Sequence, residues 1–171
     1  MGSPPPKKAR TQASAGKVMA TIFWDVEGIL LIDYLPKKTT ITGNYYVEVL
    51  RRLLQAIKDK RRGKLSRKIL LLHDNAPAHS AKVTQAALKE CKFQQLRHPA
   101  YSPDLASSDF YLFRLLKKAL RERRFSCDEE VQGAAEDWLE GQSKDFYLQG
   151  LQSLPLKWAK CIDMLGDCIE K

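Results

Sequence analysis

The sequence lacks a long apolar run, and its cysteines are few and scattered. None of its 171 residues lies in an apolar stretch approaching the roughly 20 residues that cross a bilayer, so we expect no membrane partner. The N-terminus is polar and proline-rich, unlike a signal peptide. The four cysteines (Cys91, Cys127, Cys161 and Cys168) form no C-x-x-C pair, which argues against a zinc site and favours reduced thiols inside a cell.

Acidic residues are also in deficit. Twenty Asp and Glu stand against 29 Lys and Arg, which gives a formal net charge of +9 and a pI near 9.4. This excess favours a polyanionic partner, DNA first, although a protein that is merely basic stays an alternative on charge alone. A hydrophobic share of 44% and the chain length suit one domain with a sizeable core. We expect DNA as partner and no small-molecule substrate.

Residues 1–16 have no apolar periodicity and are rich in Pro, Ser, Ala and Lys. They predict a disordered, basic, proline-rich arm. Its basic cluster at Lys7, Lys8 and Arg10 is either a patch for nuclear import or DNA contact, or a solvated tail.

From Lys17 onward, apolar patterning predicts an α/β layered domain of order ββ-α-β-α-β-α with a helical tail. We expect KILLLHD (68–74) to be a strand buried on both faces, because its apolar residues do not alternate with polar ones. The helix over 44–62 has one basic face and one apolar face, which we expect in the core and which consists of Tyr46, Val49, Leu50, Leu53, Leu54 and Ile57. The expected elements are a hairpin over 17–24 and 29–35, helices over 44–62, 79–92 and 109–124, strands over 68–74 and 93–97, and two or three further helices around 127–142, 144–154 and 155–165.

Two aspartates stand out by their position. Asp74 follows the 68–74 strand at its carboxyl end, where open α/β sheets place their sites, although it could simply start a turn. Asp109 opens a later helix and could be its N-cap, while Asp104 is read as a turn residue. Taken together, two carboxylates at one sheet edge can converge on Mg²⁺, and phosphodiester chemistry uses two such ions.

Three neighbours could assist this pair. Asn75 could hydrogen-bond a metal-bound water or the DNA backbone. For His73 and His79 we favour capping or packing roles, because no spacing here demands a transition-metal ligand.

The stretches HDNAPAHSA (73–81) and HPAYSPDLASSDFYLF (98–113) resemble the mariner-type branch of the Tc1/mariner transposases, whose segments read HDNA-x-x-H and HP-x-YSPDLAPSD. In that family the last two members of an Asp-Asp-Asp triad are separated by 34 residues, and 34 residues lie between Asp74 and Asp109. Ser107 replaces the usual Pro, and Cys168 stands where an aromatic residue is usual. Neither departure touches the carboxylates.

The resemblance implies an RNase H-like fold, a mixed sheet flanked by helices. It also implies Asp74 and Asp109 as catalytic residues and ligands of Mg²⁺ or Mn²⁺, and cut-and-paste DNA transposition by a nuclear homodimer. The family's first Asp lies in a DE-x-W segment well before the second Asp. When the same separation is counted back from Asp74, the position falls before Met1. We therefore expect residues 17–171 to be a truncated catalytic domain that misses the first central strand. Asp25 and Asp33 are poorly placed to substitute.

Three readings follow from the sequence. The first is a transposase catalytic domain that is inactive or impaired; the second is a non-catalytic DNA-binding or dimerisation module derived from a transposon; the third is a decayed reading frame. If a central strand is missing, the 17–24 and 68–74 strands would each keep an open edge. We expect these two strands either to pair directly or to leave the chain marginally stable.

Overall fold

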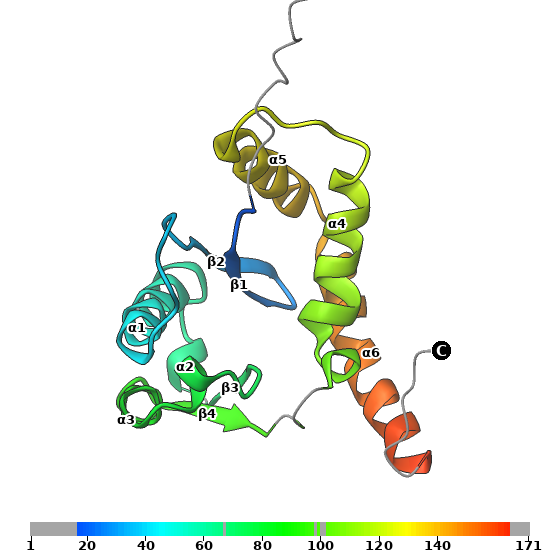
Figure 1. Ribbon diagram of the computed structural model, residues 1–171. Coiled ribbons are helices and arrows are strands. Elements are labelled where there is room, and N and C mark those ends of the chain that lie inside the picture. The colour runs from blue at the N-terminus through cyan, green and yellow to red at the C-terminus, as the bar shows by residue number, and fades with distance from the viewer. Residues whose placement is uncertain (1–16, 67, 98, 100–101, 165–171) are drawn as a thin grey trace, which may run out of the picture.

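A computed structural model describes residues 17–66, 68–97, 99 and 102–164, so the expected arm and Cys168 lie outside the described residues. Figure 1 shows a central hairpin with α1 and α3 on one side, α4 and α6 on the other, and α5 above it. The order of elements agrees with the expected ββ-α-β-α-β-α and helical tail. The elements are β1 (Ala20–Asp25), β2 (Gly28–Tyr34), α1 (Gly43–Lys60), η1 (Lys64–Ser66), β3 (Ile69–Leu72), α2 (Pro77–Ser80), α3 (Lys82–Glu90), β4 (Phe93–Leu96), η2 (Pro103–Leu105), η3 (Ser108–Phe113), α4 (Arg114–Leu120), α5 (Asp128–Glu140) and α6 (Lys144–Asp163).

The hairpin of β1 and β2 supplies apolar side chains to both layers. Phe23 belongs to a core with α1, α3 and β4, while Ile22 and Trp24 pack against a second core formed by α5, α6 and η3. Phe23 pairs with Leu31 and Trp24 with Ile29, so the register shifts by one residue between these pairs. Alternation along β1 points Phe23 to the opposite face from Ile22 and Trp24, so consecutive side chains serve opposite layers, and the bulge adds Leu30 to β2 between the two pairs.

Helix α1 forms as its pattern predicts. The Thr42 hydroxyl accepts a hydrogen bond from the Tyr45 N–H at 3.2 Å and caps the first turn, and Gly63 follows the helix with a φ of +85°. The predicted apolar face is buried at Tyr46, Val49, Leu50, Leu53 and Ile57. The opposite face is basic, but Arg52 and Arg61 are neutralised by Asp33 and Asp25 of the hairpin.

The strands form two separate two-stranded sheets, which corrects two expectations. Among the described residues β1 pairs with β2 and β3 with β4, so the first of the two alternatives, direct pairing of β1 with β3, is wrong, and the second, marginal stability, stays a prediction. The expectation that β3 is buried on both faces is also wrong, because Leu70 is 56% exposed. The reason is local: β3 is hydrogen-bonded to one neighbour, and only Leu71 of this strand is buried in the core.

Helix boundaries differ from the expected ones in three places. The 79–92 helix divides at Ala81, whose ψ of 144° separates α2 from α3. The helix expected from Asp109 begins as a π-helix, η3. The stretches around 144–154 and 155–165 form one helix, α6, with Pro155 inside it, so two further helices follow α4 in the described residues, the smaller of the two numbers expected. Pro155 removes one backbone donor, but α6 is held beyond it by the Trp158 indole, which donates to the Leu105 carbonyl at 3.1 Å.

Candidate functional site

Asp74 lies in the loop between β3 and α2, and its carboxylate is 62% exposed. Its Oδ1 accepts hydrogen bonds from the Ala76 N–H at 3.1 Å and from His79 Nδ1 at 2.6 Å. Asp74 therefore does start a turn, through its Oδ1. This turn does not compete with the ligand interpretation, because both hydrogen bonds found for this carboxylate among the described residues are made by Oδ1 and the side chain is largely exposed.

An aromatic cluster supports this loop from below. The imidazole of His73 stacks on that of His79 with 4.9 Å between ring centroids and 15° between planes. The Tyr46 ring, on α1, lies 4.1 Å from the His79 ring, and its hydroxyl is 2.9 Å from His73 Nδ1. Tyr46 and His73 are 1% and 9% exposed. The packing role expected for the two histidines is confirmed, and His79 adds a direct contact with Asp74.

The charges of these groups follow from their surroundings. Partial burial opposes ionisation of Asp74, but the Ala76 N–H and His79 outweigh it and lower the pKa of its carboxyl below the ordinary value. Burial, assisted by His79, lowers the pKa of His73 to about 4. Gln95 acts on the ring in the opposite sense, but within the described part of the chain no hydrogen bond satisfies His73 Nε2. At neutral pH an ionised Asp74 thus stands beside a neutral His73.

Asp109 lies in the first turn of η3, and Ser107, not Asp109, occupies the N-cap position. The N-cap alternative for Asp109 is therefore wrong. The preceding residue is fixed from the hairpin, because the Trp24 indole donates to the Ser108 hydroxyl at 3.0 Å. The π-helical geometry is consistent with a functional position, since π-turns inside helices often occur at sites.

Asp109 lines a cavity of about 380 Å³ between β1 with the residues before it and the helices η3, α4 and α5. The other walls include Met19, Ile22, Phe113 and Leu116, so the carboxylate stands at the border of an apolar hollow. A carboxylate in such a place needs a partner or solvent to keep its charge.

The structure does not assemble a complete metal centre. Within residues 17–66, 68–97, 99 and 102–164 no group of three or more His, Cys, Asp or Glu side chains is arranged to hold a metal ion. Asp25 and Asp33 are engaged elsewhere, as expected of residues that cannot substitute in the site. Asp25 pairs with Arg61 at 2.9 Å, and Asp33 accepts from Arg52 and from the Tyr45 hydroxyl, both at 2.6 Å.

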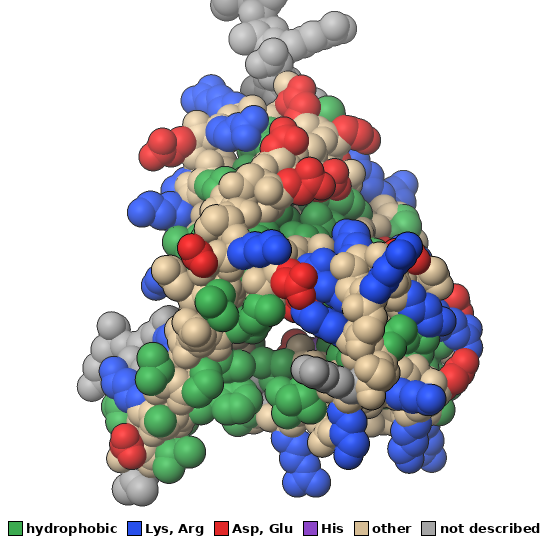
Figure 2. Space-filling model, turned by 180° about the vertical axis from the view of Figure 1, so that it is seen from behind, with side chains coloured by type: hydrophobic (Ala, Val, Ile, Leu, Met, Phe, Trp, Pro, Cys, Tyr) green, Lys and Arg blue, Asp and Glu red, His purple; other side chains and the backbone are tan. Residues whose placement is uncertain are grey.

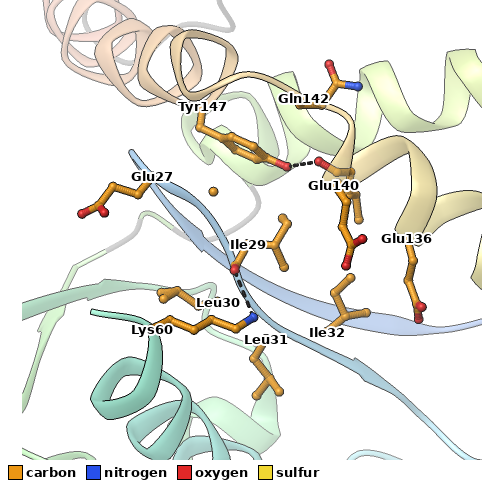
Figure 3. Close-up of a pocket in the computed structure, with 12 residues that line it drawn as sticks. Glu27, Ile29, Leu30, Leu31, Ile32, Lys60, Glu136, Glu140, Gln142 and Tyr147 are labelled. Atoms are coloured by element: carbon orange, nitrogen blue, oxygen red, sulfur yellow. Dashed lines mark hydrogen bonds between the residues drawn. The ribbon is translucent and has the colours of Figure 1, made fainter. Parts of the chain in front are cut away.

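A second cavity, of about 340 Å³, lies along β2 between α1, α5 and α6 and contains neither Asp74 nor Asp109 (Figure 3). Two polar side chains drawn there make hydrogen bonds to backbone carbonyls. The Tyr147 hydroxyl donates to the Leu139 carbonyl at 2.5 Å, and Lys60 reaches the Ile29 carbonyl at 3.4 Å (Figure 3). We read this cavity as a packing gap between layers.

Basic side chains gather on the helices α1 and α3. Figure 2 shows Lys and Arg over the side of the molecule formed by α1 and α3, and hydrophobic side chains over α6 on the other side. Helix α3 directly follows the Asp74 loop. The exposed basic residues on α1, on α3 and just beyond them include Arg51, Lys58, Arg62, Lys82, Lys89 and Lys92. In the described residues no helix is both long and apolar enough to cross a membrane.

Two residues of this site escaped sequence reasoning. Tyr46 was expected only as a core residue of α1, and nothing in the periodicity indicates that its hydroxyl reaches His73. The contact between His79 and Asp74 was missed as well, although a signal existed: a carboxylate followed by a Pro turn returns the chain, so a donor five residues later can meet it.

The sequence is similar to a known protein family and to two known proteins. A family model described as "Transposase (partial DDE domain)" matches residues 1–67. The Mariner Mos1 transposase of Drosophila mauritiana is 34% identical over 171 residues, which are 99% of this chain and 50% of Mos1. The histone-lysine N-methyltransferase SETMAR of Homo sapiens is 35% identical over 151 residues, 88% of this chain and 22% of SETMAR.

Solved structures agree with these relatives. The Mos1 transposase catalytic domain with Raltegravir and Mg matches with a TM-score of 0.86 at 34% identity, over 90% of this chain and 77% of that one. The same domain with Mn gives 0.84 at 31% identity, over 96% and 88%. A pre-cleavage Mos1 transpososome gives 0.87 at 33% identity, over 99% and 50%. These matches confirm the expected RNase H-like α/β fold, and the chain spans about half the length of Mos1.

Proposed function

Because this chain belongs to the mariner family of DNA transposases and matches its catalytic domain, we propose that it acts on DNA through a divalent cation bound by Asp74 and Asp109. The observation that carries the proposal is the Asp74 carboxylate itself. It is ionised, exposed and held by Oδ1 alone, in a chain 34% identical to a catalytic domain whose structure was solved with Mg.

The donor chemistry fits Mg²⁺ or Mn²⁺. Both are hard cations that take oxygen ligands, and both solved catalytic domains cited above contain one of them. When bound, such ions stabilise the charge that develops as a phosphodiester is cleaved or transferred. Asp74 is prepared for this by its lowered pKa, because a ligand must be deprotonated. Trp24 holds the turn before Asp109 through Ser108, so the second carboxylate starts from a supported helix end.

DNA is the proposed substrate. The Lys and Arg side chains over α1 and over α3, which follows the Asp74 loop in the chain, can neutralise phosphates without reading sequence (Figure 2). We propose a homodimer, in line with the Mos1 relative, for which a transpososome and a paired-end complex have been solved. From the family resemblance alone we also propose a nuclear location. Binding that depends on phosphate contacts should weaken steeply with salt.

The 171-residue chain by itself should cleave DNA weakly or not at all. The described residues provide two assigned carboxylates, and Asp25 and Asp33 are held in ion pairs away from them. Removing one ligand from a two-metal site removes charge stabilisation that the chemistry needs. This observation favours, as the second candidate, a non-catalytic DNA-binding or dimerisation module that descends from a transposon.

One experiment separates the two candidates. Nicking of supercoiled plasmid is measured with Mg²⁺ or Mn²⁺ for the unmodified chain, for Asp74→Ala and for the matched control Asp104→Ala, whose carboxylate lies in η2. Nicking that disappears in Asp74→Ala and persists in Asp104→Ala supports a catalytic domain. Salt-sensitive DNA binding without nicking supports the module. Absence of both binding and nicking contradicts the proposal.

A further inference from the structure

The hydrogen bond between His79 and Asp74 is the shortest contact that the Asp74 carboxylate makes within the described residues, at 2.6 Å. An ionised carboxylate only accepts, so the proton lies on His79 Nδ1. The Ala76 N–H reaches the same oxygen. Two donors on Oδ1 restrain the carboxylate, and among the described residues both of its hydrogen bonds are made by this oxygen and none by Oδ2.

The His79 ring is in turn held by packing. It is 17% exposed and lies against Tyr46 on one side and stacks on His73 at 4.9 Å. Tyr46 is fixed in α1 and also binds His73 through its hydroxyl. The orientation of His79 is therefore determined by the core, whereas its Nδ1 serves the exposed carboxylate.

We propose that His79 is the positioning residue of Asp74: its Nδ1–H holds Oδ1 so that Oδ2 is presented to the divalent cation. This inference rests on the proposed function, since it assumes that Asp74 is a metal ligand. Partners in the outer shell of a metal site orient its ligands, and losing one typically costs roughly 10- to 100-fold in metal affinity. The two halves of the His79 side chain thus have separate tasks: the ring contributes to packing, and the N–H contributes to the site.

Two substitutions separate these tasks. His79→Phe keeps a ring between Tyr46 and His73 but has no donor. His79→Asn loses the ring, but its amide nitrogen occupies the position of Nδ1 and can still donate to Asp74. If His79 has a purely structural role, both stability and metal affinity should be kept in the variant that keeps the ring. If His79 positions Asp74, metal affinity should be kept in the variant that keeps the hydrogen-bond donor.

The test measures Mn²⁺ affinity of the full chain by electron paramagnetic resonance of the free ion, together with urea unfolding of each variant. We expect His79→Phe to lose roughly 10- to 100-fold in Mn²⁺ affinity while its stability stays near that of the unmodified chain. We expect His79→Asn to keep its affinity within a few-fold although it unfolds at lower urea. Affinity that falls in His79→Asn and not in His79→Phe overturns the proposal.

Asp74→Asn distinguishes a failure of this inference from a failure of the proposed function. If Mn²⁺ binding is lost in Asp74→Asn but unchanged in His79→Phe, Asp74 is a ligand and His79 does not position it. If the unmodified chain shows no Mn²⁺ binding that depends on Asp74, the metal role of Asp74 fails, and the role of His79 fails with it.

Discussion

The close approach of α6 to the hairpin depends on a glycine, and a single methyl group tests it. A Cβ added to Gly150 would lie 2.6 Å from Cδ1 and 2.8 Å from Cε1 of Tyr111, and 2.9 Å from the Trp24 ring. Tyr111 cannot swing away freely, because its hydroxyl donates to the Phe146 carbonyl at 3.0 Å. Gly150→Ala therefore forces a shift of two aromatic rings at the contact that also anchors the Asp109 turn.

The size of the effect follows from two opposing contributions. Overpacking of a filled core costs about 1–3 kcal/mol, whereas alanine in place of glycine inside a helix contributes about 1 kcal/mol of stability. Gly133 provides the matched control: it also lies inside a helix, α5, and an added Cβ there meets nothing within 4 Å. Gly133→Ala should stabilise the chain by about 1 kcal/mol.

Urea unfolding, followed by tryptophan fluorescence, measures both variants under the same conditions. The difference between the two free energies of unfolding cancels the helix contribution and isolates the clash, which we expect to be about 1–3 kcal/mol in favour of Gly133→Ala. If Gly150→Ala proves as stable as Gly133→Ala, α6 does not approach β1 as closely as the structure has it.

Three further outcomes are expected. His73 has a pKa of about 4 in the folded chain against an ordinary 6.5, so the unfolded chain binds more protons between these pH values. The free energy of unfolding should therefore fall by at most about 3 kcal/mol as the pH drops from 6.5 to 4. Urea unfolding at each pH measures this fall, which should be absent in His73→Gln. Trp24→Phe and Ser108→Ala should each cost about 1 kcal/mol, and a double-mutant cycle that shows no coupling between them would contradict the hydrogen bond. Arg52→Gln should cost about 2 kcal/mol in urea unfolding, because it leaves the buried Asp33 carboxylate with weaker partners; an unchanged midpoint would mean that the ion pair contributes nothing.

Local signals carried most of the fold. The helix α1 is defined by its own sequence, because Thr42 provides the cap and the apolar face repeats at helical spacing. The hairpin follows from two β-rich runs around a turn whose Gly28 adopts a φ of +123°. These elements need little from the rest of the chain, which is why reading them in isolation succeeds.

Features that depend on distant neighbours were not predictable in the same way. The exposure of Leu70 depends on what covers β3, and an apolar run does not reveal that. Pro155 is a helix breaker by local rules, but contacts such as that of Trp158 with the Leu105 carbonyl hold α6 together around it.

The candidate site likewise has a part that could be predicted from the sequence and a part that could not. Asp74 and Asp109 could be selected from the sequence, because their types, positions and spacing are all visible there. The contacts that hold the segments around them in place could not be predicted. Tyr46 reaches His73 across 27 positions, and Trp24 reaches Ser108 across 84. Such contacts exist only once the layers have packed.

The central claim is that Asp74 and Asp109 contribute to one divalent-cation site. Fe²⁺ that replaces Mg²⁺ in such a site generates radicals in the presence of ascorbate and peroxide, which cut the backbone beside each ligand. For the full chain we expect cuts near both residue 74 and residue 109, suppressed together by excess Mg²⁺ and absent at both places in Asp74→Asn. Cuts at one aspartate alone, or cuts near residue 109 that persist in Asp74→Asn, would contradict a shared site.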